Sequence, residues 1–312
     1  MTIIPLTEVE VTECLNGLWQ EAFKKNSIDA LFTLLRVTGM QSSGWDSSIE
    51  TEEAFEDYNW HLKARSKKLS DKSGWRIGLL MYCHACEMSS VHSTLKNLLN
   101  ISLQKPFQTH PFIGSVKRPK KKGLFNGIPP SAKTKWNQII QLAKECNNLK
   151  LIEYIENVYN DTVRNSFSHS DYIIAESEFR WTEAFPGAMP LIDVHNLISN
   201  SFIFFSSMLS VHKQWMLSHS KLPRYLPMQD YEVLELLKSD GVLCGFKVHF
   251  SSGTYAQFQR TSSGVVSINL ILNSDGPIGF QVGDLDELKE CYVVDGIEFP
   301  YLFPRWTDNL GY

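Results

Sequence analysis

Apolar residues recur at three- and four-residue spacing through most of this 312-residue chain before Pro223. Such spacing places the apolar residues along one face of a helix and predicts amphipathic helices that pack around a common core. Residues 38–50 are expected to form a loop, and the polar stretch 52–68 predicts a solvated helix or a linker. The predicted helical stretches are 9–37 with a break at Asn26–Ser27, 75–101, 136–167 with a pause at Asn147–Asn148, and 191–219.

After Pro223 the pattern changes to alternation of apolar and polar residues, which is typical of strands. A shorter pair of strands is predicted over 171–181, and the prolines of 102–130 predict an extended loop. The expected fold class is therefore mainly α with a β-rich C-terminal module, an α+β chain. The predicted C-terminal strands are 242–250, 254–260, 265–272 and 278–282, separated by Ser-Gly, Ser-Ser-Gly and Asp-Gly turns.

These patterns divide the chain into three expected parts. Residues 1–70 form an N-terminal helical extension, residues 71–222 a helical bundle, and residues 223–312 a β-rich domain. The last part is long enough for one small sheet domain by the usual size of domains.

Composition limits the partners and the compartment. The formal net charge is −4, so a nucleic acid would have to be held by a local basic patch and not by overall charge. The six cysteines are scattered in mostly apolar surroundings, as is typical of reduced thiols. No signal-peptide pattern and no uninterrupted apolar span is evident, and we expect a cytoplasmic protein without membrane attachment.

One short stretch carries recognisable chemistry. Residues 164–169 read Arg-Asn-Ser-Phe-Ser-His, at the end of a predicted helix and just before strand-like residues. This Arg-Asn-x-x-x-His pattern resembles the motif of the HEPN family, and the resemblance covers residues 75–219. The resemblance implies a four-helix HEPN-like bundle, metal-independent cleavage of RNA without a cofactor or metal ligands, and a homodimer in which two copies of the motif face each other.

In the reaction that the resemblance implies, the ribose 2′-hydroxyl attacks its own phosphate and leaves a cyclic phosphate and a 5′-hydroxyl. His169 would move a proton, because imidazole titrates near neutrality. Arg164 would stabilise the charge of the phosphorane with its planar fork of donors, a task for which lysine is less suited. Asn165 would orient the histidine or the phosphate by hydrogen bonds.

Helix geometry adds a constraint on this motif. Each helical residue advances by about 100°, so Asn165 and His169 share a face, whereas Arg164 and His169 lie roughly 140° apart. A continuous helix would therefore separate Arg164 from His169. Either the helix ends or distorts near Ser168, as its serine-rich surroundings favour, or the catalytic groups come from two chains.

A structural interpretation of the motif stays open beside the catalytic one. Cations near a helix C-terminus are favoured, so Arg164 and His169 could serve only as caps. The chain would then be a non-catalytic HEPN-like binding or dimerisation module, with a C-terminal domain that senses a ligand or a partner.

Two further groups of residues are candidates for the same site. The basic run could contact an RNA backbone, or it could be a solvated loop. His84 and Glu87 lie in or beside the apolar seam of 75–101 and could face the motif, although a hydrogen-bonded buried histidine is the ordinary alternative. The residues of the basic run that we expect to bind RNA are Lys117, Arg118, Lys120, Lys121 and Lys122.

Cys83 and Cys86 have the CxxC spacing of metal and redox sites. They lie within an apolar helical seam and lack a second pair of ligands, which indicates core cysteines. The sequence contains no Gly-rich phosphate loop, no GxSxG elbow and no His-Glu-x-x-His, which removes the P-loop, hydrolase and zincin classes.

The sequence therefore predicts a metal-independent endoribonuclease of HEPN type, acting as a toxin or an anti-phage defence effector. RNA is the expected substrate and a second copy of the chain the expected partner. An antitoxin or another regulatory protein is a further expected partner, and one role of the outer parts would be to keep the ribonuclease silent until a trigger arrives.

Overall fold

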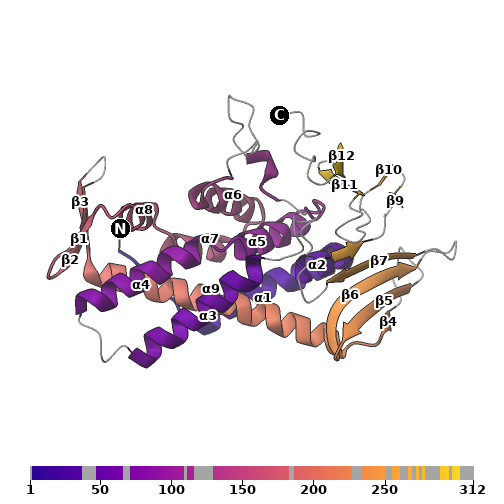
Figure 1. Ribbon diagram of the computed structural model, residues 1–312, viewed down its shortest axis with the longest axis horizontal. Helices are drawn as coiled ribbons and strands as arrows, with labels where there is room; N and C mark the ends of the chain where they lie inside the picture. The colour runs from indigo at the N-terminus through magenta and orange to yellow at the C-terminus, as the bar shows by residue number, and fades with distance from the viewer. Residues whose placement is uncertain are drawn as a thin grey trace. The chain divides into compact units, whose positions relative to one another are not determined.

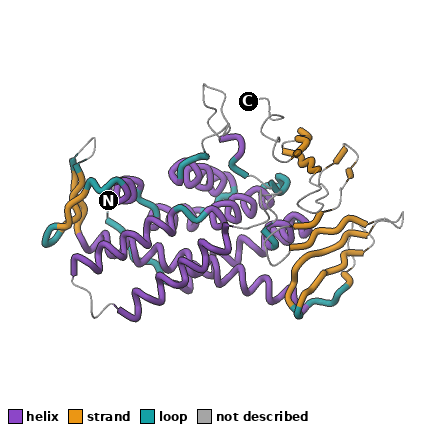
Figure 2. Tube along the Cα trace, in the orientation of Figure 1, coloured by secondary structure: helices purple, strands orange, loops and turns teal. Residues whose placement is uncertain are grey.

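The computed structural model describes residues 2–36, 47–65, 71–108, 111–115, 129–182, 186–226, 233–249, 255–260, 266–268, 272–273, 276–277, 289–294 and 297–302. The chain forms two compact units (Figures 1 and 2). The helical unit comprises Met1–Lys25, Ser48–Lys105 and Ser131–Val211, and the sheet unit comprises Asn26–Ser47, Pro106–Pro130 and His212–Tyr312. This division differs from the three consecutive parts expected from the sequence, since each unit draws on separate segments.

The helical unit contains most of the helices (Figure 1). Helix α5 lies against α1 and α6, α7 lies against α6, and α4 lies against α8. Between α8 and α9 the chain forms an antiparallel sheet of order β1-β2-β3, where the sequence predicted two strands. The elements are α1 (Glu8–Lys25), α3 (Ser47–Arg65), α4 (Asp71–Cys86), α5 (Ser89–Ser102), α6 (Ala132–Glu145), α7 (Leu149–Val158), α8 (Asp161–Ser168), β1 (Tyr172–Ile174), β2 (Glu178–Trp181), β3 (Gly187–Pro190) and α9 (Leu191–Lys221), the last of which continues into the sheet unit.

The sheet unit is built on a five-stranded antiparallel sheet of order β4-β5-β6-β7-β8. Phe32 of α2 (Ser27–Leu34) packs edge-on against Phe258, with ring centroids 4.5 Å apart, and also contacts Phe246. The predicted strand over 278–282 lies outside the described residues. The strands are β4 (Tyr225–Leu226), β5 (Val233–Ser239), β6 (Val242–His249), β7 (Tyr255–Arg260) and β8 (Val266–Ile268), followed by the pairs β9 (Leu272–Asn273) with β10 (Gly276–Pro277) and β11 (Lys289–Val294) with β12 (Ile297–Leu302).

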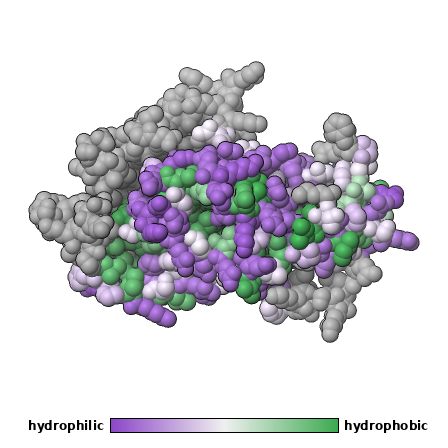
Figure 3. Space-filling view, turned by 180° about the vertical axis from the view of Figure 1, so that it is seen from behind, coloured by the Kyte–Doolittle hydropathy of each residue, from purple (hydrophilic) through white to green (hydrophobic). Residues whose placement is uncertain are grey.

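The chain is thus an α+β protein, mostly helical, with antiparallel sheets concentrated in its C-terminal part. Within the described residues, no helix is both long enough and apolar enough to cross a membrane. Figure 3 shows hydrophilic residues over much of the described surface on one side, with smaller apolar patches between them.

Side-chain caps fix where several helices begin. Asn26, Asn148 and Asn160 each accept a hydrogen bond from the backbone N–H three residues later, at 3.0 Å, at the starts of α2, α7 and α8. Ser131 does the same for α6. Each cap satisfies a backbone donor that the first helical turn leaves without a partner. The predicted break at Asn26–Ser27 is confirmed.

Two predicted long helices are each divided in the structure. The stretch 75–101 is α4 and α5, because the chain turns at Glu87 and Met88, whose N–H groups bond to His84 O and Ala85 O. The end of the stretch 136–167 contains a further break at Tyr159 and Asn160, which separates α7 from α8. The motif therefore lies on a separate short helix and not at the end of a long one.

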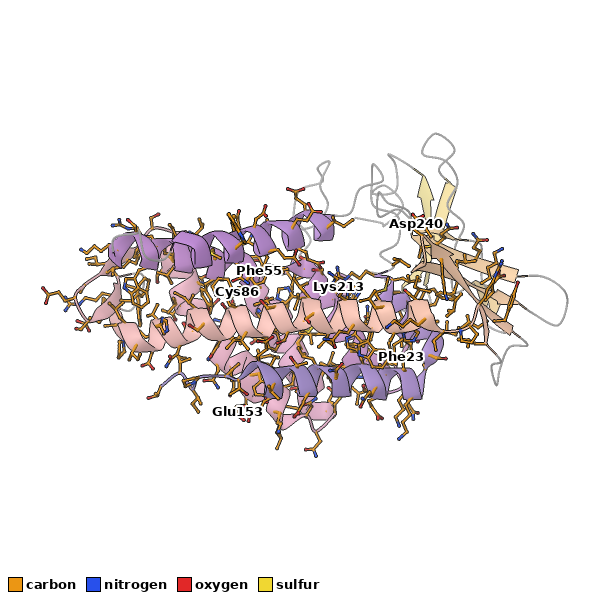
Figure 4. The ribbon with its side chains drawn as sticks, turned by 90° about the horizontal axis from the view of Figure 1, so that it is seen from below. Phe23, Phe55, Cys86, Glu153, Lys213 and Asp240 are labelled. Carbon is orange, nitrogen blue, oxygen red and sulfur yellow. The ribbon has the colours of Figure 1, made fainter. Side chains whose placement is uncertain are left out.

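The N-terminal residues belong to the core of the helical unit. Ile3 is 1% exposed and lies in the same apolar cluster as Leu79, Val163 and Leu197, which come from α4, α8 and α9. Phe55 of α3 is also 1% exposed and stacks on Phe202 of α9, with ring centroids 5.6 Å apart (Figure 4). Segments expected to form a separate extension are thus part of the helical unit.

A buried amide network holds the extended N-terminal segment. The Asn200 side chain accepts a hydrogen bond from Leu6 N–H and donates one to Ile4 O, both at 2.8 Å, and donates another to Asn157 O at 3.1 Å. Asn157 Oδ1 accepts from Ile4 N–H at 2.8 Å, and Asp193 Oδ1 accepts from Ile3 N–H at 3.1 Å. These bonds satisfy backbone groups that would otherwise be buried without partners.

Replacement of Asn200 by alanine should therefore destabilise the helical unit by about 2–4 kcal/mol, since it leaves several buried backbone groups without partners. Chemical denaturation measures the change in the free energy of unfolding. Asn137→Ala, on the exposed face of α6, is the matched control and should change that free energy by less than about 0.5 kcal/mol. Equal effects of the two substitutions would contradict the role of the network.

A buried histidine should make the fold sensitive to acid. Burial, assisted by the charge of Lys135, lowers the pKa of His92 from 6.5 to about 3. His92 is fully buried and packs edge-on against Trp136, with ring centroids 4.6 Å apart. The folded state therefore holds the neutral imidazole where the unfolded chain binds a proton, so stability is complete above about pH 6.5 and falls as the pH decreases.

The free energy of unfolding should decrease by about 1.4 kcal/mol for each pH unit between roughly pH 6 and pH 4.5. Urea titrations at several pH values measure this slope. The His92→Gln variant should show a shallower slope over the same window, whatever its stability at neutral pH. An unchanged slope would show that another group causes the acid sensitivity.

Candidate functional site

The motif helix α8 is fixed at its start by a contact with α4. The backbone N–H of Asn160 donates to Tyr82 Oη at 2.8 Å, and the Tyr82 hydroxyl donates to Asn160 O at 3.3 Å. Tyr82 is fully buried, and burial raises the pKa of its hydroxyl, so the phenol stays neutral. Val163 of α8 is also fully buried. One face of α8 therefore lies against the core, and its position relative to α4 is fixed.

The end of α8 is a Schellman motif. Asp171 N–H donates to Ser166 O at 2.9 Å, and Ser170 N–H donates to Phe167 O at 3.1 Å. Ser170 has the left-handed φ of 59° that this cap requires. His169 is the C-cap residue, and its side chain is exposed. The helix thus ends after Ser168, as the composition of the motif predicted.

Arg164 faces the connection between α4 and α5. Its Nη2 forms an ion pair with Glu87, and its Nη1 donates to Asn165 Oδ1 at 2.7 Å. The Arg164 side chain is 24% exposed and that of Glu87 is 41% exposed. The structure therefore brings Arg164, Asn165 and Glu87 together at a partly open site, where a charged ligand can reach the guanidinium.

Three other predictions about the site differ from the structure or lie outside what it describes. Asn165 Oδ1 is bonded to Arg164, whereas the sequence suggested that Asn165 orients the histidine or the phosphate. His84 donates from Nε2 to Thr51 O at 3.1 Å and packs edge-on against Tyr58, so it contacts α3. The basic run of Lys117, Arg118, Lys120, Lys121 and Lys122 lies outside the described residues.

Two lysines of α6 also lie beside this site, and the sequence motif did not indicate them. Lys133 donates to Asp161 Oδ2 at 2.8 Å, and Lys135 donates to Ser89 Oγ at 3.0 Å. Asp161 and Ser89 are the first residues of α8 and α5, so both lysines connect α6 to neighbouring elements. The signal that could have identified them is two lysines in the first turn of a helix, directly after the Ser131 cap.

The charges of this region influence one another. Although burial raises the pKa of Asp161, hydrogen bonds from Lys133 and Tyr159 outweigh it and hold that pKa below its usual value. Burial and the bond to Asp161 raise the pKa of Tyr159, whose hydroxyl donates to Asp161 Oδ1 at 2.9 Å. Burial lowers the pKa of Lys135, and the carboxylate of Glu87 opposes that shift.

The two cysteines of the CxxC sequence are core residues, as predicted. Cys83 is 9% exposed and Cys86 is fully buried. Burial raises the pKa of the Cys83 thiol to about 11, and that of Cys86 is raised as well, so both thiols are protonated at neutral pH. Cys83 Sγ lies 3.7 Å from Arg164 O and supports the backbone of the motif helix.

Comparison with known proteins adds no assignment. No family model matches the chain, and no curated protein or solved structure matches it significantly. The chemistry of the site therefore has to be argued from its own residues.

The left-handed Ser170 offers a test of the helix end. A residue other than glycine in this conformation carries a strain that glycine avoids. Ser170→Gly should therefore raise the free energy of unfolding by about 0.5–1 kcal/mol. Ser210→Gly, in the regular part of α9, should lower it by about 0.5 kcal/mol. Thermal unfolding distinguishes the two outcomes, and a destabilised Ser170→Gly variant would contradict the cap geometry.

Proposed function

We propose that this chain is a metal-independent endoribonuclease of HEPN type, which cleaves RNA by attack of a ribose 2′-hydroxyl on the adjacent phosphate. The observation that supports the proposal most directly is the partly open Arg164 guanidinium on a short helix that ends at an exposed histidine, His169. Both ends of α8 are held, by the Asn160 cap and by the Schellman motif.

The roles follow from the chemistry of each side chain. Arg164 supplies a permanent positive charge for the phosphorane, and its two Nη atoms present donors in a planar fork. His169 lies at the helix end, where no regular turn covers its imidazole, and acts as the group that exchanges protons with the substrate. Asn165 holds the guanidinium through its Oδ1.

We propose that the active form is a homodimer. His169 is exposed, and the hydrogen bonds of the Arg164 guanidinium go to Glu87 and Asn165. A second protomer that brings its own motif to this surface would supply a histidine and an arginine to a shared phosphate. The same exposed position suits an antitoxin or another regulatory partner that covers the motif.

The ion pair itself favours a second candidate function. An arginine that binds Glu87 connects α8 to the α4–α5 connection, which is a structural role. In that case the chain is a non-catalytic HEPN-like module whose sheet unit binds a ligand or a partner protein. This candidate shares the fold and lacks the cleavage.

Cleavage assays with purified protein separate the two functions. The wild-type chain should cut total RNA or transfer RNA in the presence of a chelator and leave 2′,3′-cyclic phosphate ends. His169→Ala should lower the rate by at least about a hundredfold, because it removes the group that exchanges protons. Arg164→Ala should lower it by a similar factor, and Arg164→Lys should restore only part of it.

Matched controls test whether these losses are specific. His195→Ala and Arg180→Ala replace exposed residues outside the motif and should leave cleavage within about twofold of the wild-type rate. Circular dichroism should show that all variants are folded. Cleavage that disappears in chelator, or that persists in His169→Ala, would reject the mechanism and leave the binding module.

A further inference from the structure

Two cations from different helices lie near one carboxylate in the helical unit. Arg164 of α8 pairs directly with Glu87. Lys135 of α6 bonds to Ser89, two residues after Glu87, and its pKa responds to the Glu87 charge. All three side chains are at least partly accessible to solvent. The ion pair joins α8 to the α4–α5 connection, and the bond from Lys135 joins α6 to the first residue of α5, so both cations reach the same connection.

Stability alone gives little reason for this arrangement. An ion pair as exposed as Arg164 with Glu87 contributes little to stability. The position of Lys135 is unfavourable by itself, because burial disfavours its charged form. In the described protein, Arg164 Nε is also buried without a hydrogen-bond acceptor. The stability of the fold therefore does not explain why Arg164 and Lys135 lie beside one carboxylate.

A carboxylate resembles a phosphodiester in the property that matters here. Each presents two oxygens that share one negative charge, and the arginine fork binds both kinds of group in the same way. Lysine contributes a compact charge that suits a second oxygen. Glu87 lies between helices, in a connection of two residues, so its side chain can rotate away without unfolding either helix.

We propose that Arg164 and Lys135 form a phosphate-binding subsite for single-stranded RNA, which the Glu87 carboxylate fills until a substrate phosphate displaces it. The proposal rests on the proposed function, because it takes the phosphate to be that of RNA. It adds Lys135 as a substrate-binding residue and gives Glu87 the role of an internal competitor. Lys135 leaves Ser89 when RNA binds and returns to Ser89 when the RNA leaves.

Binding of an RNA that cannot be cleaved tests whether Glu87 competes with the substrate phosphate. The probe is a fluorescent single-stranded oligonucleotide with 2′-O-methyl ribose, and fluorescence anisotropy gives its Kd. Glu87→Gln keeps the size of the side chain and an acceptor oxygen for Arg164 but removes the negative charge. It should bind the probe about tenfold more tightly than the wild type. If Glu87 only positioned Arg164, the affinity would be unchanged or lower.

The role of Lys135 in phosphate binding is tested by two matched substitutions on α6. Lys135→Gln should weaken binding and reduce the slope of log Kd against log salt by about 0.7, the value for one phosphate contact on a single strand. Lys144→Gln, in the exposed last turn of α6, should change neither quantity. Equal effects of the two substitutions would indicate general electrostatics and overturn the subsite.

The effect of inorganic phosphate on thermal stability tests the phosphate subsite independently of the proposed ribonuclease activity. Phosphate should raise the melting temperature of Glu87→Gln more than that of the wild type, compared with chloride at equal ionic strength. If it does so while the wild type cleaves no RNA, the subsite stands and the ribonuclease is wrong. If the wild type cleaves RNA while Glu87→Gln shows neither tighter binding nor the phosphate effect, the ribonuclease stands and the subsite is wrong.

Discussion

The hydrogen bonds between Tyr82 and the backbone of Asn160 determine where the motif helix begins, and the remaining features of the site depend on that position. With the start fixed against α4, the regular helix places Val163 in the core and Arg164 toward the α4–α5 connection. Because α8 is short, the same fixed start also sets the position of its C-terminal Schellman motif. Tyr82 is fully buried, so solvent does not compete for its hydrogen bonds with Asn160.

Much of the helical content followed from apolar spacing, because packing against a core imposes that spacing on any amphipathic helix. The breaks at Glu87 and at Tyr159 did not follow, since connections of two residues hardly disturb the apolar register on either side. Asn160 carried a signal that was available, a capping side chain followed by Asp161 in the first turn. Met88 offers no such side chain, and its extended backbone has no counterpart in the sequence pattern.

At the candidate site, features that depend on neighbouring residues were predictable from the sequence, and contacts between distant residues were harder to predict. The end of the helix at Ser168 was predictable, because serine and aspartate compete locally for backbone hydrogen bonds. Glu87 was one of the residues expected to face the motif, and it does so as the partner of Arg164, which lies 77 positions later. The sequence could not rank Glu87 above the other polar residues of that stretch. His84 was one of them, and it contacts α3 instead. Lys135 was missed because lysines near the start of a helix are ordinary surface residues in sequence.

The amide network at the start of the chain has a consequence for synthesis on the ribosome. Ile3 is synthesised 190 residues before its hydrogen-bond partner Asp193, and Leu6 is synthesised 194 residues before its partner Asn200. Contacts this distant in sequence form late in folding. Because Ile3 shares its apolar cluster with Val163 of the motif helix, the core beneath the motif is completed only after α9 has emerged. The motif helix therefore lacks part of its supporting core until α9 (Leu191–Lys221) has been synthesised.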